Sequence, residues 1–243
     1  MSPLVHSGRR CAAAALLAAA WLLAAVPAAP AAEPAPTPVP TGAFVSWSHP
    51  NSIAPIRRHP NAGSPEIARV HLNTEGGAPE VYPILARFTD AAGRHWTRIA
   101  VPMRPNGRTG WVRSEVLGPA TPTNMLLVVD RSALRATLTK AGRVIWTSRI
   151  GVGAPATPTP AGRFWIREKL RVTFGGMYGP RAFGTSDYSV LTDWPGGGVI
   201  GIHGTDQPGL IPGRPSHGCI RLRNAAVLRL FELMPVGTPM HVR

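Results

Sequence analysis

The sequence predicts a mainly β protein, a small barrel followed by a larger β-rich domain with one or two short helices. Short apolar runs broken by Pro, Gly and Asn recur through residues 44–118. After a Pro-containing linker, β-branched and alternating runs resume. The 27 prolines and 26 glycines leave room for only one convincing helical stretch. These patterns favour many short strands over helices.

Residues 1–32 are predicted to be a signal peptide. Arg9 and Arg10 precede the Ala/Leu-rich run Cys11–Val26, and residues 29–31 (APA) offer a small-residue cleavage site. The apolar run, about 16 residues, is short for a membrane span. We therefore expect secretion across the cytoplasmic membrane to the cell wall or periplasmic space, with an uncleaved membrane anchor as the alternative.

A first domain is expected over residues 42–118, behind a tether. Residues 33–41 (EPAPTPVPT) alternate with proline, which favours an extended tether. The apolar runs that follow are expected to be barrel strands: 67–72, 81–88 and 96–101. Residues 107–112 (GRTGWV) resemble the end of bacterial SH3-like domains, which implies a role in binding or positioning cell-wall peptides. Residues 118–124 are predicted to be a linker.

The second domain is expected over residues 124–243. Residues 134–139 alternate apolar and polar side chains, residues 144–150 are rich in β-branched ones, and Ala141-Gly142 lies between them as a turn. The many glycines of residues 174–198 favour a long loop, after which the apolar run Val199–Ile202 is predicted to be a buried strand that ends at His203.

One helix is predicted to begin with Asn224 as its N-cap. Its apolar stripe consists of Val227, Leu228, Phe231 and Met234. Pro235 and Gly237 end it.

The chain is strongly basic, with a formal net charge of +14. Loss of residues 1–32 would remove only Arg9 and Arg10 from that balance. A basic surface favours anionic partners. Because we expect export, nucleic acid is excluded in favour of anionic cell-wall polymers, although a charge that only keeps the protein soluble fits equally well.

Cysteine usage points to chemistry at one position. Without the signal segment, Cys219 is the only cysteine. Exported proteins generally pair their cysteines, so a lone thiol is buried, paired between chains or reactive.

The neighbours of Cys219 could activate it. A thiol needs a base or nearby positive charge to become a nucleophile. His203 lies upstream across a Pro- and Gly-rich loop, and His217 and Arg221 flank the cysteine. In the run 216–219 (SHGC), Gly218 permits a tight backbone whose N–H groups could stabilise an oxyanion.

These residues resemble the signature of the YkuD-type L,D-transpeptidase domain. The matching segments are residues 203–205 (HGT), 216–221 (SHGCIR), 158–164 (PTPAGRF), 178–184 (YGPRAFG) and 236–239 (VGTP). The resemblance covers residues 124–243. It implies that Cys219 is the nucleophile, His203 the base and the Gly204 carbonyl the group that orients the imidazole. It also implies an oxyanion hole from the backbone of His217, Gly218 and Cys219, with Ser216 and Arg221 as further site residues.

The resemblance further implies a reaction and partners. Cys219 would attack the third residue of a donor stem peptide, release D-alanine and form a thioester. The amine of an acceptor stem's third residue would resolve it as a crosslink, and carbapenems would acylate the same thiol. No cofactor or metal is expected. Tyr178, Arg181 and Phe183 are candidates for the donor groove, or for packing of its loop.

Other interpretations remain beside this one. His203, His217 and Cys219 could ligate zinc, although His-x-Cys spacing is awkward for chelation. Water instead of an amine would give an L,D-carboxypeptidase. From another class, the chain could be a catalytically weak cell-wall-binding protein. The order of His before Cys argues against NlpC/P60 peptidases, and a T-L-x-T-C strand typical of sortases is missing from the sequence.

Overall fold

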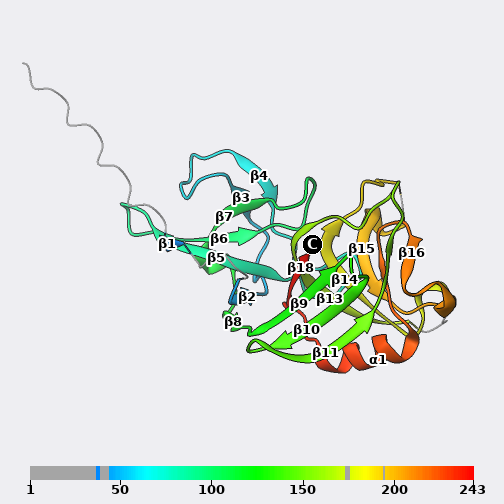
Figure 1. Ribbon diagram of the computed structural model, residues 1–243. Coiled ribbons are helices and arrows are strands. Elements are labelled where there is room, and N and C mark those ends of the chain that lie inside the picture. The colour runs from blue at the N-terminus through cyan, green and yellow to red at the C-terminus, as the bar shows by residue number, and fades with distance from the viewer. Residues whose placement is uncertain (1–36, 39–43, 173–175, 194) are drawn as a thin grey trace, which may run out of the picture. The chain divides into compact units, whose positions relative to one another are not determined.

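The computed structural model describes residues 37–38, 44–172, 176–193 and 195–243, whose strands form two hydrogen-bonded sheets (Figure 1). The predicted signal peptide lies outside the described residues. Within the described ranges, no helix has the length and apolar character needed to cross a membrane. The mainly β class expected from the sequence is confirmed.

The first sheet lies in residues 37–122 and has the order β4-β3-β7-β6-β5-β2-β8, with β1 paired to β5. Its strands are β1 (Thr37–Pro38), β2 (Ser46–Ser48), β3 (Pro55–Arg57), β4 (Glu66–Arg69), β5 (Tyr82–Thr89), β6 (His95–Ala100), β7 (Thr109–Arg113) and β8 (Thr121–Pro122). A 3-10 turn covers Ser114–Val116. An SH3-like barrel stays a prediction for this part of the chain.

Two segments expected to be irregular pair with this sheet. Strand β1 falls inside the predicted tether and pairs with Arg87 and Ala86 of β5. Strand β8 falls inside the predicted linker and pairs with β2. Both strands are two residues long, so their sequences carry too little pattern to distinguish a strand from an extended linker.

The second sheet has the order β11-β10-β9-β18-β13-β14-β15-β17-β12-β16. Its strands are β9 (Met125–Asp130), β10 (Arg135–Lys140), β11 (Arg143–Arg149), β12 (Gly151–Gly153), β13 (Gly162–Arg171), β14 (Arg181–Tyr188), β15 (Val199–His203), β16 (Gly213–Ser216), β17 (Ile220–Arg221) and β18 (Pro239–Val242). Three 3-10 turns cover Gly176–Tyr178, Pro195–Gly198 and Pro208–Leu210.

The β10–β11 hairpin matches its prediction. Ala141 and Gly142 both have positive φ, 48° and 77°. That is the conformation that two-residue hairpin turns require. Ala136 and Leu138 are buried, as the alternation indicates.

Strand β14 contradicts the expectation of a long loop over residues 174–198. It pairs with β13 on one side and β15 on the other. Residues 182–187 are all buried. A central strand is covered on both faces, so it shows no alternation, and its glycine suggested a loop instead.

The helix α1 (Asn224–Leu233) is present, but two details of its prediction are wrong. Arg223 occupies the N-cap position, and Asn224 is the first helical residue. Its side chain contacts another loop instead, as described below. Leu228 is 41% exposed, because Val227, Leu230 and Met234 form the buried line of the helix.

Buried side chains join the two sheets. The Trp165 Nε1–H donates to the Val81 carbonyl at 2.8 Å. Arg167 of β13 forms a buried ion pair with Glu80, in which Arg167 Nε donates to Glu80 Oε1 at 2.8 Å. The first sheet is therefore packed on the second through specific buried contacts.

Candidate active site

His203 and Cys219 are brought together by two parallel neighbouring strands. Strand β15 ends at His203 and pairs with β17, which follows Cys219 directly. A Cβ placed on Gly201 would lie 3.8 Å from His203 Cδ2 and 3.9 Å from Cys219 Sγ. The backbone N–H of Gly201 donates to Cys219 Sγ at 3.4 Å. The sheet register, more than the intervening loop, therefore sets the thiol beside the imidazole.

The His203 ring is buried and held in one tautomer. Only 4% of the residue is exposed, and its Nδ1 lies 2.6 Å from the Gly204 carbonyl oxygen. Because burial disfavours the charged ring, it lowers the pKa of His203 to about 4, with Arg221 acting in the same direction. A carbonyl only accepts, so in the neutral ring Nδ1 carries the proton. The lone pair is then on Nε2, as a general base requires.

Cys219 is a free cysteine with a protonated thiol at rest. Burial raises its pKa, and Asp187 raises it further, whereas the Gly201 N–H and Arg221 lower it. A neutral thiol beside a neutral imidazole needs the ring to take its proton during attack. The two pKa directions therefore describe a thiol–imidazole pair that is neutral before reaction.

The turn before Cys219 is fixed by three hydroxyl groups on three successive carbonyls. Ser189 Oγ donates to the His217 carbonyl at 3.3 Å, and Thr159 Oγ1 donates to the Gly218 carbonyl at 2.6 Å. Ser216 Oγ donates to the carbonyl of Cys219 at 2.6 Å. Because each peptide unit is planar, a hydrogen bond that fixes its carbonyl also fixes the direction of its N–H.

One of the predicted oxyanion donors has a hydrogen-bond partner within the turn. The Gly218 N–H donates to Ser216 Oγ at 3.2 Å, so it is already used within the turn. The Gly218 carbonyl is held by Thr159, which turns the Cys219 N–H of the same peptide in the opposite direction. Ser216 thus supports the turn, and the role of the Cys219 N–H as an oxyanion donor stays a prediction.

Gly218 has the tight backbone conformation that was predicted for it. Its φ is +122°, and a Cβ there would lie 2.6 Å from Ile200 Cδ1. Both the backbone and the space exclude a side chain.

Asn224 contacts the turn that follows His203. Its Oδ1 accepts the Thr205 N–H at 2.9 Å, beside the carbonyl that orients His203. A Cβ on Gly204 would clash with this oxygen and with Gly179. The helix therefore fixes the 203–205 turn through its first residue.

The three candidates for the donor groove have different environments. The Tyr178 ring is 38% exposed and meets the His203 ring edge-on, with centroids 4.8 Å apart. Arg181 is half-buried, and its guanidinium lies over Phe231. Phe183 is 1% exposed and packs in the core against Phe231, which favours the packing alternative for this residue over substrate contact. An inward position in a central strand explains this burial.

Arg221 is half-buried beside the pair. Its Nε is buried and has no hydrogen-bond partner among the residues that the structure describes. The charge lowers the pKa of both His203 and Cys219. Arg221 thus acts electrostatically on the site whether or not it also contacts substrate.

Sequence reasoning missed Thr159, Ser189, Gly201 and Asp187. Thr159 lies in the quoted PTPAGRF segment, which was the one signal for it. Asp187 is completely buried in β14, and within the described part of the chain its Oδ2 has no hydrogen-bond partner. Burial raises the pKa of Asp187 to about 8. No spacing in the sequence relates Ser189 or Asp187 to the cysteine.

The zinc interpretation requires several ligands gathered at one place. Among the described residues, no three His, Cys, Asp or Glu side chains gather as a metal site.

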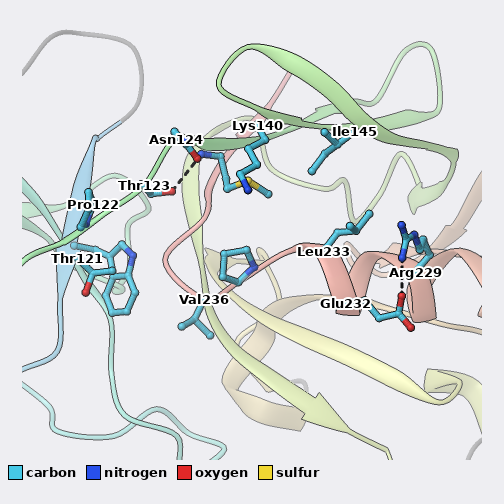
Figure 2. Close-up of a pocket in the computed structure, with 13 residues that line it drawn as sticks. Thr121, Pro122, Thr123, Asn124, Lys140, Ile145, Arg229, Glu232, Leu233 and Val236 are labelled. Carbon is cyan, nitrogen blue, oxygen red and sulfur yellow. Dashed lines mark hydrogen bonds and ion pairs between the residues drawn. The ribbon is translucent and has the colours of Figure 1, made fainter.

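A pocket away from the pair lies between the β8–β9 segment and the end of α1 (Figure 2). It is lined by Trp47, Thr121, Pro122, Thr123, Asn124, Met125, Lys140, Ile145, Arg229, Glu232, Leu233, Pro235 and Val236. None of the predicted site residues lines it.

A thiol beside a buried, oriented imidazole on a β-rich scaffold is the arrangement of a cysteine nucleophile. Residues 124–242 match the family model of the YkuD L,D-transpeptidase catalytic domain. The chain therefore carries a catalytic domain of this family in those residues, which confirms the resemblance drawn from the sequence.

Individual proteins are similar to this chain as well. The chain is 35% identical to Bacillus subtilis YkuD over 112 residues, 46% of this chain and 62% of that protein. It is 26% identical to L,D-transpeptidase 1 of Mycobacterium tuberculosis over 232 residues, 79% of this chain and 90% of that protein. A crystal structure of a mutant Enterococcus faecium L,D-transpeptidase matches 49% of this chain and 50% of that chain, at 28% identity and a TM-score of 0.40. The chain spans 62% and 54% of the lengths of the two Bacillus YkuD proteins it matches.

Proposed function

We propose that this protein is a cysteine-dependent peptidoglycan L,D-transpeptidase that links the third residues of two stem peptides. Cys219 is the nucleophile, His203 the general base and the Gly204 carbonyl the group that orients the ring. The observation that carries the proposal is the neutral, buried His203, fixed on Gly204 at 2.6 Å beside Cys219. It lies within the segment that matches the catalytic-domain family.

The chemistry follows from this arrangement in two acyl transfers. His203 Nε2 takes the thiol proton while Sγ attacks the carbonyl of the donor's third residue. The Cys219 N–H stabilises the oxyanion, as donors in such sites do. His203 then returns the proton to the leaving D-alanine amine, and a thioester remains. An amine of the acceptor stem attacks the thioester, transfers its proton to His203, and releases Cys219 as a crosslink forms.

The partners are proposed on the same basis. Donor and acceptor stem peptides of peptidoglycan are the substrates, and a carbapenem is expected to acylate Cys219 by opening its β-lactam ring. The basic surface suits anionic cell-wall polymers. Residues 1–32 would export the chain to that compartment, and residues 42–118 would form the SH3-like domain.

A product analysis tests the function. The purified protein is incubated with disaccharide-tetrapeptide, and the products are identified by mass. We expect a crosslinked dimer and free D-alanine from the wild type and neither product from Cys219→Ala. Tripeptide without dimer would indicate an L,D-carboxypeptidase. No product and no imipenem adduct from a folded wild type would contradict the proposal and favour a wall-binding protein.

A further inference from the structure

A loop of the first sheet reaches the part of the second sheet that supports the nucleophile. Residues 102–107 connect β6 to β7. They contact residues 187–191, which run from the end of β14 toward the turn at Pro195–Gly198. We call these segments the 102–107 loop and the 187–191 segment.

Asn106 binds the 187–191 segment as a neighbouring strand would. Its Nδ2 donates to the Tyr188 carbonyl at 3.0 Å, and its Oδ1 accepts the Tyr188 N–H at 3.1 Å. The same Nδ2 donates to Asp187 Oδ1 at 2.8 Å. One amide therefore satisfies both backbone groups of Tyr188 and one oxygen of a buried carboxyl.

Arg104 adds a second attachment. Its Nη2 donates to the Ser189 carbonyl at 3.1 Å and to the Leu191 carbonyl at 3.0 Å. Its guanidinium lies 4.7 Å from the centroid of the Tyr188 ring. The Tyr188 hydroxyl in turn donates to the Pro102 carbonyl at 3.1 Å. The 102–107 loop thus binds successive residues of the 187–191 segment.

Ser189 connects this segment to Cys219. It is 5% exposed, and its Oγ donates to the carbonyl of His217. A Cβ on Gly218 would lie 3.5 Å from the same Oγ. The hydroxyl therefore lies against the peptide that sets the direction of the Gly218 N–H, one residue before the nucleophile.

We propose that Asn106 is a positioning residue for Cys219, acting through the 187–191 segment and the Ser189 hydroxyl. The first domain is then part of the catalytic apparatus, whether or not it also binds cell wall. The inference deepens the proposed function and rests on it for its kinetic consequences. Small displacements of a nucleophile are costly, since a shift of about 1 Å can lower a rate about 100-fold.

Two readouts on the full chain test this. We expect Asn106→Ala to lower the limiting rate of imipenem acylation about 10- to 100-fold, with less than a twofold change in the half-saturating concentration. Hydrogen exchange of the 216–222 peptide, followed by mass, should accelerate in the same variant. The exchange readout needs no enzymatic activity. A wild type that is not acylated therefore contradicts the proposed function, while exchange still decides the positioning.

Matched variants separate positioning from general weakening. Arg108→Ala removes an exposed side chain from the same β6–β7 connection. Thr74→Val removes a buried hydrogen bond from Thr74 Oγ1 to Glu168 Oε2, which also joins the two sheets. For both variants, the limiting rate of imipenem acylation should lie within threefold of the wild-type rate. An equal loss in Thr74→Val, or wild-type acylation and exchange in Asn106→Ala, would overturn the proposal.

The route through Ser189 has its own test. Ser189→Ala should reproduce the loss seen in Asn106→Ala, and the double variant should lose little more, because coupled residues are not additive. Fully additive losses would refute this route. Ser189→Ala also serves alone if Asn106→Ala does not fold, since it removes a single hydroxyl and leaves the 102–107 loop in place.

Discussion

His203 and Cys219 are both withdrawn from water, and burial has opposite effects on their pKa values. It lowers the pKa of the imidazole and raises that of the thiol, since each neutral form is the less costly one to bury. The site therefore keeps both groups neutral until a substrate arrives. His203 and Cys219 were candidates from their spacing and flanking glycines, and the family resemblance added the role of the Gly204 carbonyl.

The first prediction concerns stability at low pH. The folded protein binds a proton at His203 only near pH 4, whereas the unfolded chain binds it near pH 6.5. This contribution to stability is thus complete above pH 6.5 and is lost as the pH falls toward 4. We expect a loss of about 3 kcal/mol from this group by pH 4. The unfolding free energy, measured with urea at several pH values in this range, should fall less steeply with falling pH in His203→Gln than in the wild type. In His59→Gln, a change at an exposed position, it should fall as in the wild type.

A second prediction concerns Asp187. Burial raises the pKa of the Asp187 carboxyl to about 8, and the charge of the ionised carboxyl raises the pKa of Cys219. Asp187→Asn keeps an oxygen for Asn106 and removes that charge. The pH profile of Cys219 alkylation by iodoacetamide should move to lower pH, whereas Asp193→Asn, at an exposed position, should leave it in place. An unshifted profile in Asp187→Asn would show that the carboxyl does not act on the thiol.

At the scale of elements, β14 and the 216–219 turn decide how the site is supported. Strand β14 is central and buried, and it leads into the segment that carries Ser189. The turn depends on three hydroxyl groups from distant parts of the chain. Its positive φ at Gly218 was predictable from the glycine itself. Its hydrogen-bond partners were not, because they approach from other strands.

The third prediction concerns this turn. In Gly218→Ala, the new Cβ meets Ile200 and the backbone conformation is strained, which should destabilise the protein by more than about 1 kcal/mol. Imipenem acylation should fall about 100-fold or more, since the oxyanion donor is displaced. Gly209→Ala is the matched control, because a Cβ there meets nothing within 4 Å. Normal acylation of a folded Gly218→Ala variant would contradict the role of the turn.

At the scale of the whole molecule, the two sheets are joined by buried polar contacts. Arg167 lies between Glu80, 1% exposed, and the more exposed Glu75, with Nη1 2.9 Å from Glu75 Oε2. The two sheets are formed by separate parts of the sequence, before and after about residue 124. These ion pairs nevertheless join them. Sequence patterns identified both parts, but they did not indicate that charged groups are buried where the parts meet.

The fourth prediction tests this coupling. Glu80→Ala leaves the Arg167 charge buried with weaker compensation, so we expect a loss of about 3–5 kcal/mol in unfolding free energy. Glu75→Ala, at the exposed partner, should cost at most about 1 kcal/mol. Thermal unfolding of both variants, followed by calorimetry, compares them directly. Equal losses of unfolding free energy in the two variants would mean that burial of the Arg167–Glu80 pair does not contribute to stability.

Residue type and local spacing predicted the β class and the 203–205 and 216–221 motifs, and the resemblance that these motifs carry predicted the catalytic-domain family. The folded structure was needed to show that β14 is a strand, that Phe183 is core and that Asn224 binds Thr205 instead of capping its helix. The folded structure also brings Thr159 and Ser189 to the nucleophile turn, and Asn106 to the segment that carries Ser189. Single Thr, Ser and Asn side chains have no characteristic spacing, so their partners are set by strand order and register, which only the folded chain possesses.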